Sequence, residues 1–218
     1  MSHNIECVLF DLDGTLADTA PDLAYALNAT LAHFGRPELT LAQIRPVVSH
    51  GGIALISLGF DMHPDQPGFE DRRQHLLKVY LKNICRDTRL FPGMDDVLSE
   101  LCQNAIPWGI VTNKPSWLTD PLMANLPMPC STDVIVSGDT CEHSKPHPQP
   151  LLHASEMLDM PSERCLYVGD AQRDIAAGKA AHMVTACALF GYLQAQDRPE
   201  DWQADFNLEQ PQDLLALL

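Results

Sequence analysis

Two aspartates, Asp11 and Asp13, end a short apolar run near the start of the chain and are followed by Gly14 and Thr15. Side chains alternate along an extended segment, so carboxylates two residues apart point the same way. Gly14 allows the backbone to turn sharply or to approach a ligand closely. Paired carboxylates on such a turn suit a hard cation that prefers oxygen ligands, and one of them could also attack phosphorus. Acidic turns after strands are common, so the interpretation depends on the rest of the chain.

Three further polar clusters follow later in the chain. Thr112 and Asn113 end an apolar run, Lys145 precedes a proline, and Asp170 and Asp174 follow another apolar run. Each cluster has an ordinary explanation, because a lysine before a proline is usually solvated and an acid in the first turn of a helix complements the helix N-terminus. The clusters therefore indicate chemistry only if the fold gathers them in one place.

The elements that carry these residues alternate between strand and helix. Short apolar runs are expected to be strands near residues 7–10, 108–112, 134–137, 165–168 and 184–188, with segments of helical period between the later ones. Such alternation predicts a parallel sheet covered by helices on both faces, with right-handed crossovers. Ligands bind beyond the carboxyl ends of the strands in these sheets. We therefore expect Asp11, Thr112 and Asp170 to meet at one edge of the sheet.

Residues 18–87 interrupt this alternation with helical patterns only. The first helix is expected over residues 21–34, with Asp18 or Thr19 as its N-terminal cap. We predict an α/β protein with a Rossmann-like parallel sheet core that is covered by helices and formed by residues 1–17 and 88–218. Residues 18–87 are predicted to form an inserted helical cap domain over the edge where the polar residues meet.

In order and spacing, the acidic turn and the three later clusters resemble the four motifs of the haloacid dehalogenase-like (HAD) hydrolases. The resemblance extends from Val8 to about Leu189. It implies that Asp11 is a nucleophile that forms an aspartyl-phosphate, and that Asp13 protonates the leaving oxygen and later activates water. The phosphatases and mutases of this family carry an aspartate where Asp13 stands, and its dehalogenases do not. The resemblance therefore favours phosphate chemistry.

The same resemblance implies a bound Mg²⁺. Asp11, the main-chain carbonyl of Asp13 and the carboxylate of Asp170 would hold the ion, with water and phosphate completing its oxygen ligands. Asp174 would bind metal-bound water or orient Lys145.

The resemblance also assigns the contacts to the phosphate group. Thr112 and the neighbouring backbone at Asn113 would bind a phosphate oxygen. Lys145 would be a third catalytic residue, because it would neutralise charge on the phosphate and steady the nucleophile.

In the cap, Ser49, His50, Gly51 and Gly52 form the segment best suited to bind the rest of the substrate. Two glycines that open a helix can present backbone N–H groups to an anion, and a plain turn between helices is the alternative. The basic residues of the last cap helix, among them Arg73, are expected in solvent.

Two stretches of the core resemble the phosphoglycolate phosphatase branch of the family and, within it, the bacterial N-acetylmuramic acid 6-phosphate phosphatases of cell-wall recycling. They are residues 108–115 and the segment with Gly191-Tyr192 and Trp202 to Asp205. The resemblance implies a Mg²⁺-dependent phosphomonoester hydrolase that acts on N-acetylmuramic acid 6-phosphate. A phosphoglycolate phosphatase and a sugar-phosphate mutase are the alternatives. A binding protein without activity is disfavoured, because no motif residue is missing.

Composition narrows the class of protein further. A formal net charge of −15 over 218 residues argues against nucleic acid and anionic membrane surfaces as partners and favours a small-molecule phosphate ester. No targeting signal and no apolar run of about 18 residues is visible, so we expect a cytoplasmic protein, as a monomer or weak homodimer. The seven cysteines include no CxxC pair and are expected to be reduced and mostly buried.

His182 ends the predicted helix after Asp174, at a place where relatives usually have glycine. This position favours a positive φ, which histidine tolerates better than most residues. We expect some local strain at His182 and no loss of activity.

Overall fold

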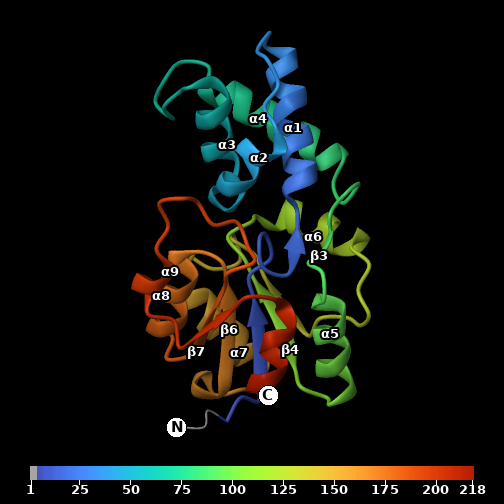
Figure 1. The fold of residues 1–218 in the computed structure, drawn as a ribbon, viewed down its shortest axis with the longest axis vertical. Coiled ribbons are helices and arrows are strands. Elements are labelled where there is room, and N and C mark those ends of the chain that lie inside the picture. The colour runs from blue at the N-terminus through green and yellow to red at the C-terminus, as the bar shows by residue number, and fades with distance from the viewer. Residues whose placement is uncertain (1–3) are drawn as a thin grey trace.

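Six parallel strands form the central sheet of the computed structural model, which describes residues 4–218 (Figure 1). Their order across the sheet is β5-β4-β1-β6-β7-β8. The strands are β1 (Cys7–Phe10), β4 (Trp108–Val111), β5 (Val134–Val136), β6 (Cys165–Gly169), β7 (Val184–Ala188) and β8 (Phe206–Leu208). Phe10 pairs with Ile110 on one side and with Val168 on the other, so β1, β4 and β6 end at about the same level. The predicted Rossmann-like α/β class is confirmed.

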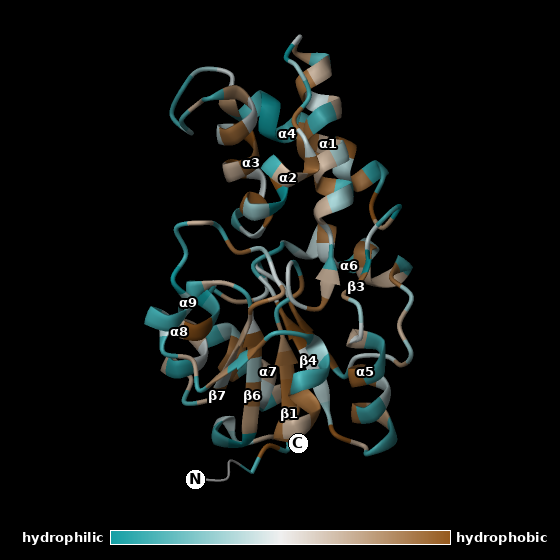
Figure 2. Cartoon of the chain, in the orientation of Figure 1, coloured by the Kyte–Doolittle hydropathy of each residue, from teal (hydrophilic) through white to brown (hydrophobic). Residues whose placement is uncertain are grey.

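Helices cover both faces of this sheet, as the alternation in the sequence predicts. They are α5 (Met94–Gln103), α6 (Ser116–Asn125), α7 (Gln149–Met157), α8 (Gln172–Ala180), the short α9 (Pro199–Trp202) and the 3-10 helix η3 (Pro211–Leu217). Val8 and Phe10 of β1 pack in one apolar cluster with α5 and η3, whereas Cys7 and Leu9 pack in a second cluster with α7 and α8. A strand buried on both faces must be apolar at every position, and Figure 2 shows β1 as hydrophobic along its length.

A group of helices lies over the carboxyl ends of the strands (Figure 1). They are α1 (Ala20–His33), α2 (Leu41–Ile44), the 3-10 helix η1 (Arg45–His50), α3 (Gly51–Phe60) and α4 (Phe69–Lys82). The chain enters and leaves them through an antiparallel ribbon of β2 (Ala17–Asp18) and β3 (Arg89–Leu90), which the sequence does not predict. The inserted helical cap is therefore present, and the division at residues 17/18 and 87/88 stays a prediction.

Asp22 in the first turn of α1 joins the two connections. Its buried carboxylate accepts hydrogen bonds from the backbone N–H groups of Asp87 and Thr88 at 2.9 Å each and from the Thr88 hydroxyl at 2.7 Å. A buried charge of this kind needs such donors, because burial without them is costly. The start of α1 is thus bound to the segment that returns to the core.

The segment Leu41–Phe60 is long and apolar enough to cross a membrane by length and composition, which is weak evidence on its own. The sequence prediction of no such segment was wrong in this respect. However, the helical backbone is interrupted within it, because Gly51 has a φ of 72° where η1 meets α3. The segment therefore consists of three shorter helical elements of the cap, α2, η1 and α3.

One expectation about the cysteines was also wrong. Cys102 near the end of α5 and Cys130 before β5 form a disulfide, and the fold brings their Cα atoms to 6.8 Å although 28 residues separate them. That distance is within the reach of a disulfide, and sequence spacing alone gives no sign of it. The other five cysteines are free, and Cys7, Cys165 and Cys187 are buried as expected.

Candidate active site

The polar residues that follow the strands lie together at the carboxyl edge of the sheet. Asp11 follows β1, Thr112 follows β4, and Asp170 follows β6, and these three strands are neighbours. All three side chains are almost fully buried. The topology therefore brings together residues that are up to 159 positions apart in the sequence, from 11 to 170.

Lys145 reaches the centre of this group from the loop before α7. Its Nζ atom lies 2.9 Å from Asp11 Oδ1 and 2.8 Å from Asp174 Oδ1. It also donates to the Tyr167 hydroxyl at 2.7 Å and to the Val111 carbonyl at 2.8 Å. The side chain is thus buried and saturated with partners, in contrast to the solvated lysine that its sequence context would ordinarily indicate.

Asp174 combines two of the roles that the sequence left open. Its Oδ1 pairs with Lys145, and its Oδ2 accepts the backbone N–H of Ala171 at 3.0 Å at the start of α8. Asp174 therefore orients Lys145 and complements the helix N-terminus at the same time.

Asp11, Asp170 and Asp174 form a buried carboxylate cluster whose ligand oxygens all lie within 4.8 Å of one another. Burial, together with the charges of Asp11 and Asp174, raises the pKa of Asp170 to about 7. Burial also raises the pKa of Asp11, against the opposing charge of Lys145. Among residues 4–218, Asp170 Oδ1 has no hydrogen-bond partner. An unpartnered buried oxygen beside two further carboxylates fits a divalent cation such as Mg²⁺.

The Asp13 carboxylate lies outside this cluster and has partners of its own. Its Oδ1 is 2.9 Å from Lys114 Nζ and accepts the Thr19 hydroxyl at 2.6 Å. Thr19 holds the N-cap position of α1, as expected, but its side chain makes no capping bond because it turns to Asp13. Burial alone would lower the pKa of Lys114, yet that pKa is raised because the Asp13 carboxylate and Tyr80 stabilise the ammonium.

Asn113 connects the loop after β4 to the loop that carries Lys145. Its Nδ2 donates to the Lys145 carbonyl at 2.9 Å, and its Oδ1 accepts the Lys145 backbone N–H at 3.0 Å. The Thr112 hydroxyl accepts the Lys114 backbone N–H at 3.1 Å. The loop after β4 thus positions both Lys145 and Lys114.

The segment Gly191-Tyr192 supports Asp170 from behind. The Tyr192 backbone N–H donates to Asp170 Oδ2 at 2.9 Å. A Cβ atom at Gly14 or at Gly191 would overlap the Asp170 side chain, and Gly14 also has a φ of 90°. Both glycines are needed because the backbone approaches this carboxylate so closely.

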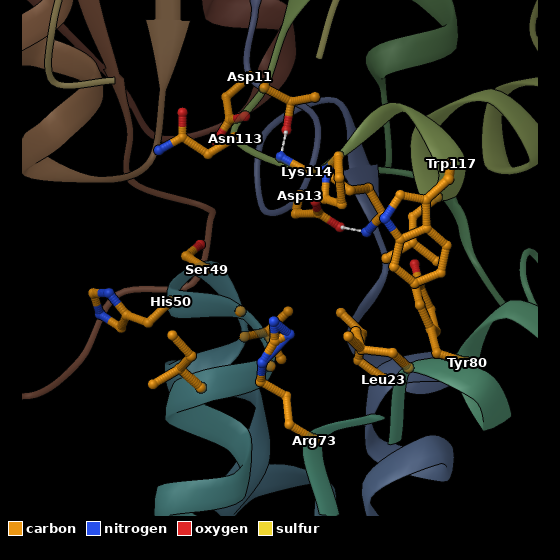
Figure 3. Close-up of a pocket in the computed structure, with 18 of the residues that line it drawn as sticks. Asp11, Asp13, Leu23, Ser49, His50, Arg73, Tyr80, Asn113, Lys114 and Trp117 are labelled. Carbon is orange, nitrogen blue, oxygen red and sulfur yellow. Dashed lines mark hydrogen bonds and ion pairs between the residues drawn. The ribbon is translucent and has the colours of Figure 1, made fainter. Parts of the chain in front are cut away.

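A cavity of about 640 Å³ separates the carboxyl edge of the sheet from the cap (Figure 3). Asp11, Asp13, Thr112 and Asn113 line it from the core. The cap contributes the predicted segment with Ser49, His50, Gly51 and Gly52, together with Arg73.

Ser49 links the cap directly to the carboxylate cluster. Its hydroxyl donates to Asp170 Oδ2 at 2.7 Å. The Gly51 N–H already donates to the Val48 carbonyl, so it is less suited to an anion than the glycine pair suggests. Burial lowers the pKa of His50, and the charge of Arg173 lowers it further.

Sequence reasoning missed three side chains of this site. Lys114 is described above, and the Arg173 Nη2 atom lies 4.0 Å from Asp11 Oδ2 on the cavity wall. The expectation for Arg73 was wrong, because this side chain lines the cavity instead of pointing into solvent. Lys114 and Arg173 stand directly beside motif residues, but the direction of a side chain in a loop or in the first turn of a helix cannot be read from the sequence.

Known proteins resemble this chain along almost its whole length. The family model of the haloacid dehalogenase-like hydrolases matches residues 8–188. A phosphoglycolate phosphatase of Xanthomonas campestris is 44% identical over 95% of this chain and 93% of its own. An N-acetylmuramic acid 6-phosphate phosphatase of Pseudomonas putida is 37% identical over 98% of this chain and 96% of its own. The solved structure of a predicted phosphoglycolate phosphatase of Haemophilus somnus superposes with a TM-score of 0.86, covers 98% of each chain and is 24% identical.

Proposed function

The chain belongs to the haloacid dehalogenase-like hydrolases and acts on phosphate esters, and from that premise we propose that its substrate is N-acetylmuramic acid 6-phosphate. The reaction releases inorganic phosphate and N-acetylmuramic acid through an aspartyl-phosphate on Asp11. In the cell this reaction would serve the recycling of cell-wall amino sugars in the cytoplasm.

In the first half of the reaction, a carboxylate oxygen of Asp11 attacks the phosphorus. The bond between phosphorus and the sugar oxygen breaks, and the leaving oxygen takes a proton from Asp13. Lys145, at 2.9 Å from Asp11, holds the nucleophile in place and offsets its charge. Thr112 lines the cavity, and its hydroxyl would bind a phosphate oxygen.

In the second half, water attacks the phosphorus of the aspartyl-phosphate. Asp13 accepts the proton of this water, the bond between phosphorus and the Asp11 oxygen breaks, and phosphate leaves. Lys114 Nζ lies 2.9 Å from Asp13 Oδ1, so this contact would hold the Asp13 side chain in position for the step.

Asp11 and Asp170, together with the main-chain carbonyl of Asp13, would hold Mg²⁺. When bound, the ion would offset the charges of the carboxylates and of the phosphate. The unpartnered Asp170 Oδ1 is the observation that supports this assignment. Asp174 stays outside the proposed ligand set, because Lys145 and Ala171 already occupy its two oxygens.

The size of the cavity carries the proposal on the substrate. A volume of about 640 Å³ lies within the range of pockets for molecules larger than a two-carbon acid. Trp117 lines the cavity and is 45% exposed, so it offers an apolar face to a ring. A phosphoglycolate molecule would leave most of this space filled with water.

Phosphoglycolate is the second candidate, since the relative of that name from Xanthomonas campestris is 44% identical. Its hydrolysis would use the same groups at the sheet edge. A sugar-phosphate mutase would use them too, but would return the phosphate to its product.

Comparing the kcat/KM values of the purified protein for the two esters, with Mg²⁺ present, tests the proposal. We expect the higher value for N-acetylmuramic acid 6-phosphate. A tenfold preference for phosphoglycolate, about 1.4 kcal/mol, would overturn the substrate while leaving the phosphatase intact. Formation of an isomer without release of phosphate would indicate a mutase.

A further inference from the structure

We propose that Arg73 on α4 binds the carboxylate of the leaving group, so that the enzyme selects phosphate esters of carboxylated sugars. The inference deepens the proposed function and rests on it. N-acetylmuramic acid 6-phosphate carries its carboxylate on a lactyl ether, well away from the phosphate. A receptor for that group must therefore stand in the cap, across the cavity from Asp11.

Arg73 has this position. Figure 3 shows its side chain extending from the cap into the cavity, opposite Asp13 and Lys114. The stem of the side chain passes over Gly52, where an added Cβ atom would contact Arg73 Cγ at 3.7 Å and Leu77 at 3.6 Å. These are ordinary van der Waals distances, so the Arg73 stem packs directly beside Gly52 at the cavity wall.

The charges around the cavity distinguish Arg73 from the other cations that line it. Lys114 is paired with Asp13, and Arg173 faces Asp11, so both serve the carboxylates of the core. Within residues 4–218, the only ion pair of Arg73 joins its Nε to Glu70 Oε2 at 3.2 Å.

This ion pair leaves Arg73 available for a ligand. Glu70 is 61% exposed, and an ion pair in such a position is weak because water screens it. Among the described residues 4–218, the Arg73 guanidinium has this ion pair and no hydrogen bond to another side chain or to the backbone. A guanidinium with both ends open forms paired hydrogen bonds with a planar carboxylate.

The net charge of the protein makes such a cation necessary. At −15, with Asp11 and Asp13 on the cavity wall, the chain repels a substrate that carries a carboxylate in addition to its phosphate. Lys145 and Lys114 are already engaged by these aspartates. Arg73 is the group that would offset the additional negative charge.

A pair of matched substrates tests the inference. N-acetylglucosamine 6-phosphate has the same sugar and phosphate but lacks the lactyl carboxylate. In Arg73→Met, the ratio of kcat/KM for N-acetylmuramic acid 6-phosphate to kcat/KM for N-acetylglucosamine 6-phosphate should fall by about 10- to 100-fold. Arg73→Lys keeps the positive charge but loses the planar guanidinium that can form two hydrogen bonds with a carboxylate. The ratio of the two kcat/KM values should therefore fall less in this variant than in Arg73→Met.

Lys78→Met is the matched control, because Lys78 is an exposed cation of the same helix outside the cavity. It should leave the ratio unchanged. Inhibition by free N-acetylmuramic acid provides a second measurement that does not depend on turnover, and it should weaken in Arg73→Met by a similar factor. Circular dichroism and thermal melting of each variant verify that it is folded.

An Arg73→Met variant that loses activity equally on both esters would overturn the inference. A selective loss on glucose 1,6-bisphosphate relative to glucose 6-phosphate, without one on the N-acetylmuramic acid ester, would also overturn it, because the arginine would then bind a second phosphate. If the wild type hydrolyses phosphoglycolate but neither sugar ester, the proposed substrate is wrong, and the role of Arg73 is tested separately. In that case the activity of Arg73→Met is measured on phosphoglycolate and on ethyl phosphate, which lacks the carboxylate. A selective loss on phosphoglycolate would support carboxylate binding by Arg73, and equal losses on both esters would overturn it.

Discussion

At the scale of single residues, the candidate site is a cluster of buried charged side chains, most of which are paired with a group of opposite charge. Lys145 lies between Asp11 and Asp174 and is bonded to both, whereas Asp170 forms no ion pair with any residue in the described range 4–218. Asp13 is held by Lys114 outside this group. In the proposed mechanism, the nucleophile Asp11 is paired with Lys145 and the acid–base group Asp13 with Lys114, and each role can be tested by substitution.

Asp13→Asn should slow departure of the leaving group by about 10²–10⁴-fold for a sugar phosphate, because an amide cannot supply the proton. p-Nitrophenyl phosphate should lose much less, since its leaving group barely needs protonation. The measurement is kcat for both esters, with Asp95→Asn, an exposed acid of α5, as the control. Equal losses on both esters would contradict the acid role of Asp13.

At the proposed Mg²⁺ site, the Asp170 carboxyl would make binding of the ion dependent on pH. With a pKa of about 7, this group is largely protonated below that value, and a proton competes with the cation. The affinity for Mg²⁺ should therefore fall as the pH is lowered from 7.5 to 5.5, by up to about tenfold per pH unit. Calorimetric titrations at several pH values measure it, and an affinity that is flat over this range would refute the prediction.

The raised pKa of Asp170 also makes the stability of the metal-free protein depend on pH. Its folded state holds a proton on Asp170 that the unfolded chain, with a pKa of 3.8, has released. The contribution of this group to stability is therefore present at low pH and is lost as the pH rises towards 7. Asp170→Asn should remove this part of the pH dependence, as measured by urea unfolding of the metal-free protein.

At the scale of elements, the ends of helices and strands position the residues of the site, and some helix ends have a strained backbone conformation. His182 follows the last turn of α8 with a φ of 59°, as its place after the helix predicts. The left-handed conformation costs a residue with a side chain more than it costs glycine. Strain of this kind lies on the far end of α8 from Asp174 and does not enter the site.

His182→Gly should therefore stabilise the protein by about 0.5–1 kcal/mol. Ala180→Gly, two residues earlier in the helix, is the matched control and should destabilise it by a similar amount, because its backbone is helical. Urea unfolding of both variants measures the difference. Destabilisation in both would show that the side chain of His182 contributes more than its backbone conformation costs.

At the scale of the whole molecule, the cavity exists only because two parts of the chain face each other. The cap contributes Ser49 and Arg73, and the core contributes Asp13 and Thr112. The Ser49 hydroxyl on Asp170 and the ribbon of β2 and β3 hold the two parts together in this arrangement. A ligand that fills the cavity must touch both.

Hydrogen exchange should reveal this contact. In Asp11→Asn, which lacks the nucleophile and should not turn over, N-acetylmuramic acid 6-phosphate with Mg²⁺ should protect backbone amides at 49–53 in the cap and at 112–118 in the core. Inorganic phosphate with Mg²⁺ is the control and should protect the core segment alone, because it occupies the sheet edge only. Protection confined to the core with the sugar ester as well would contradict a substrate that spans the cavity.

Several properties of this protein follow from the sequence by itself. The acidic turn after β1, the alternation of strands and helices, and the positive φ of His182 are local, because they depend on residues a few positions apart. Parallel strands then carry Asp11, Thr112 and Asp170 to one edge by topology alone. The four motifs and the fold class could therefore be predicted without a structure.

Other properties were decided by the tertiary structure. Lys114 meets Asp13 across 101 positions, Arg73 points into the cavity, and Cys102 reaches Cys130. Each depends on how a helix is rotated about its axis or on where a loop comes to lie, and the local pattern specifies neither. Chain neighbours determine which element forms and where it ends, whereas packing between distant elements determines what each side chain contacts.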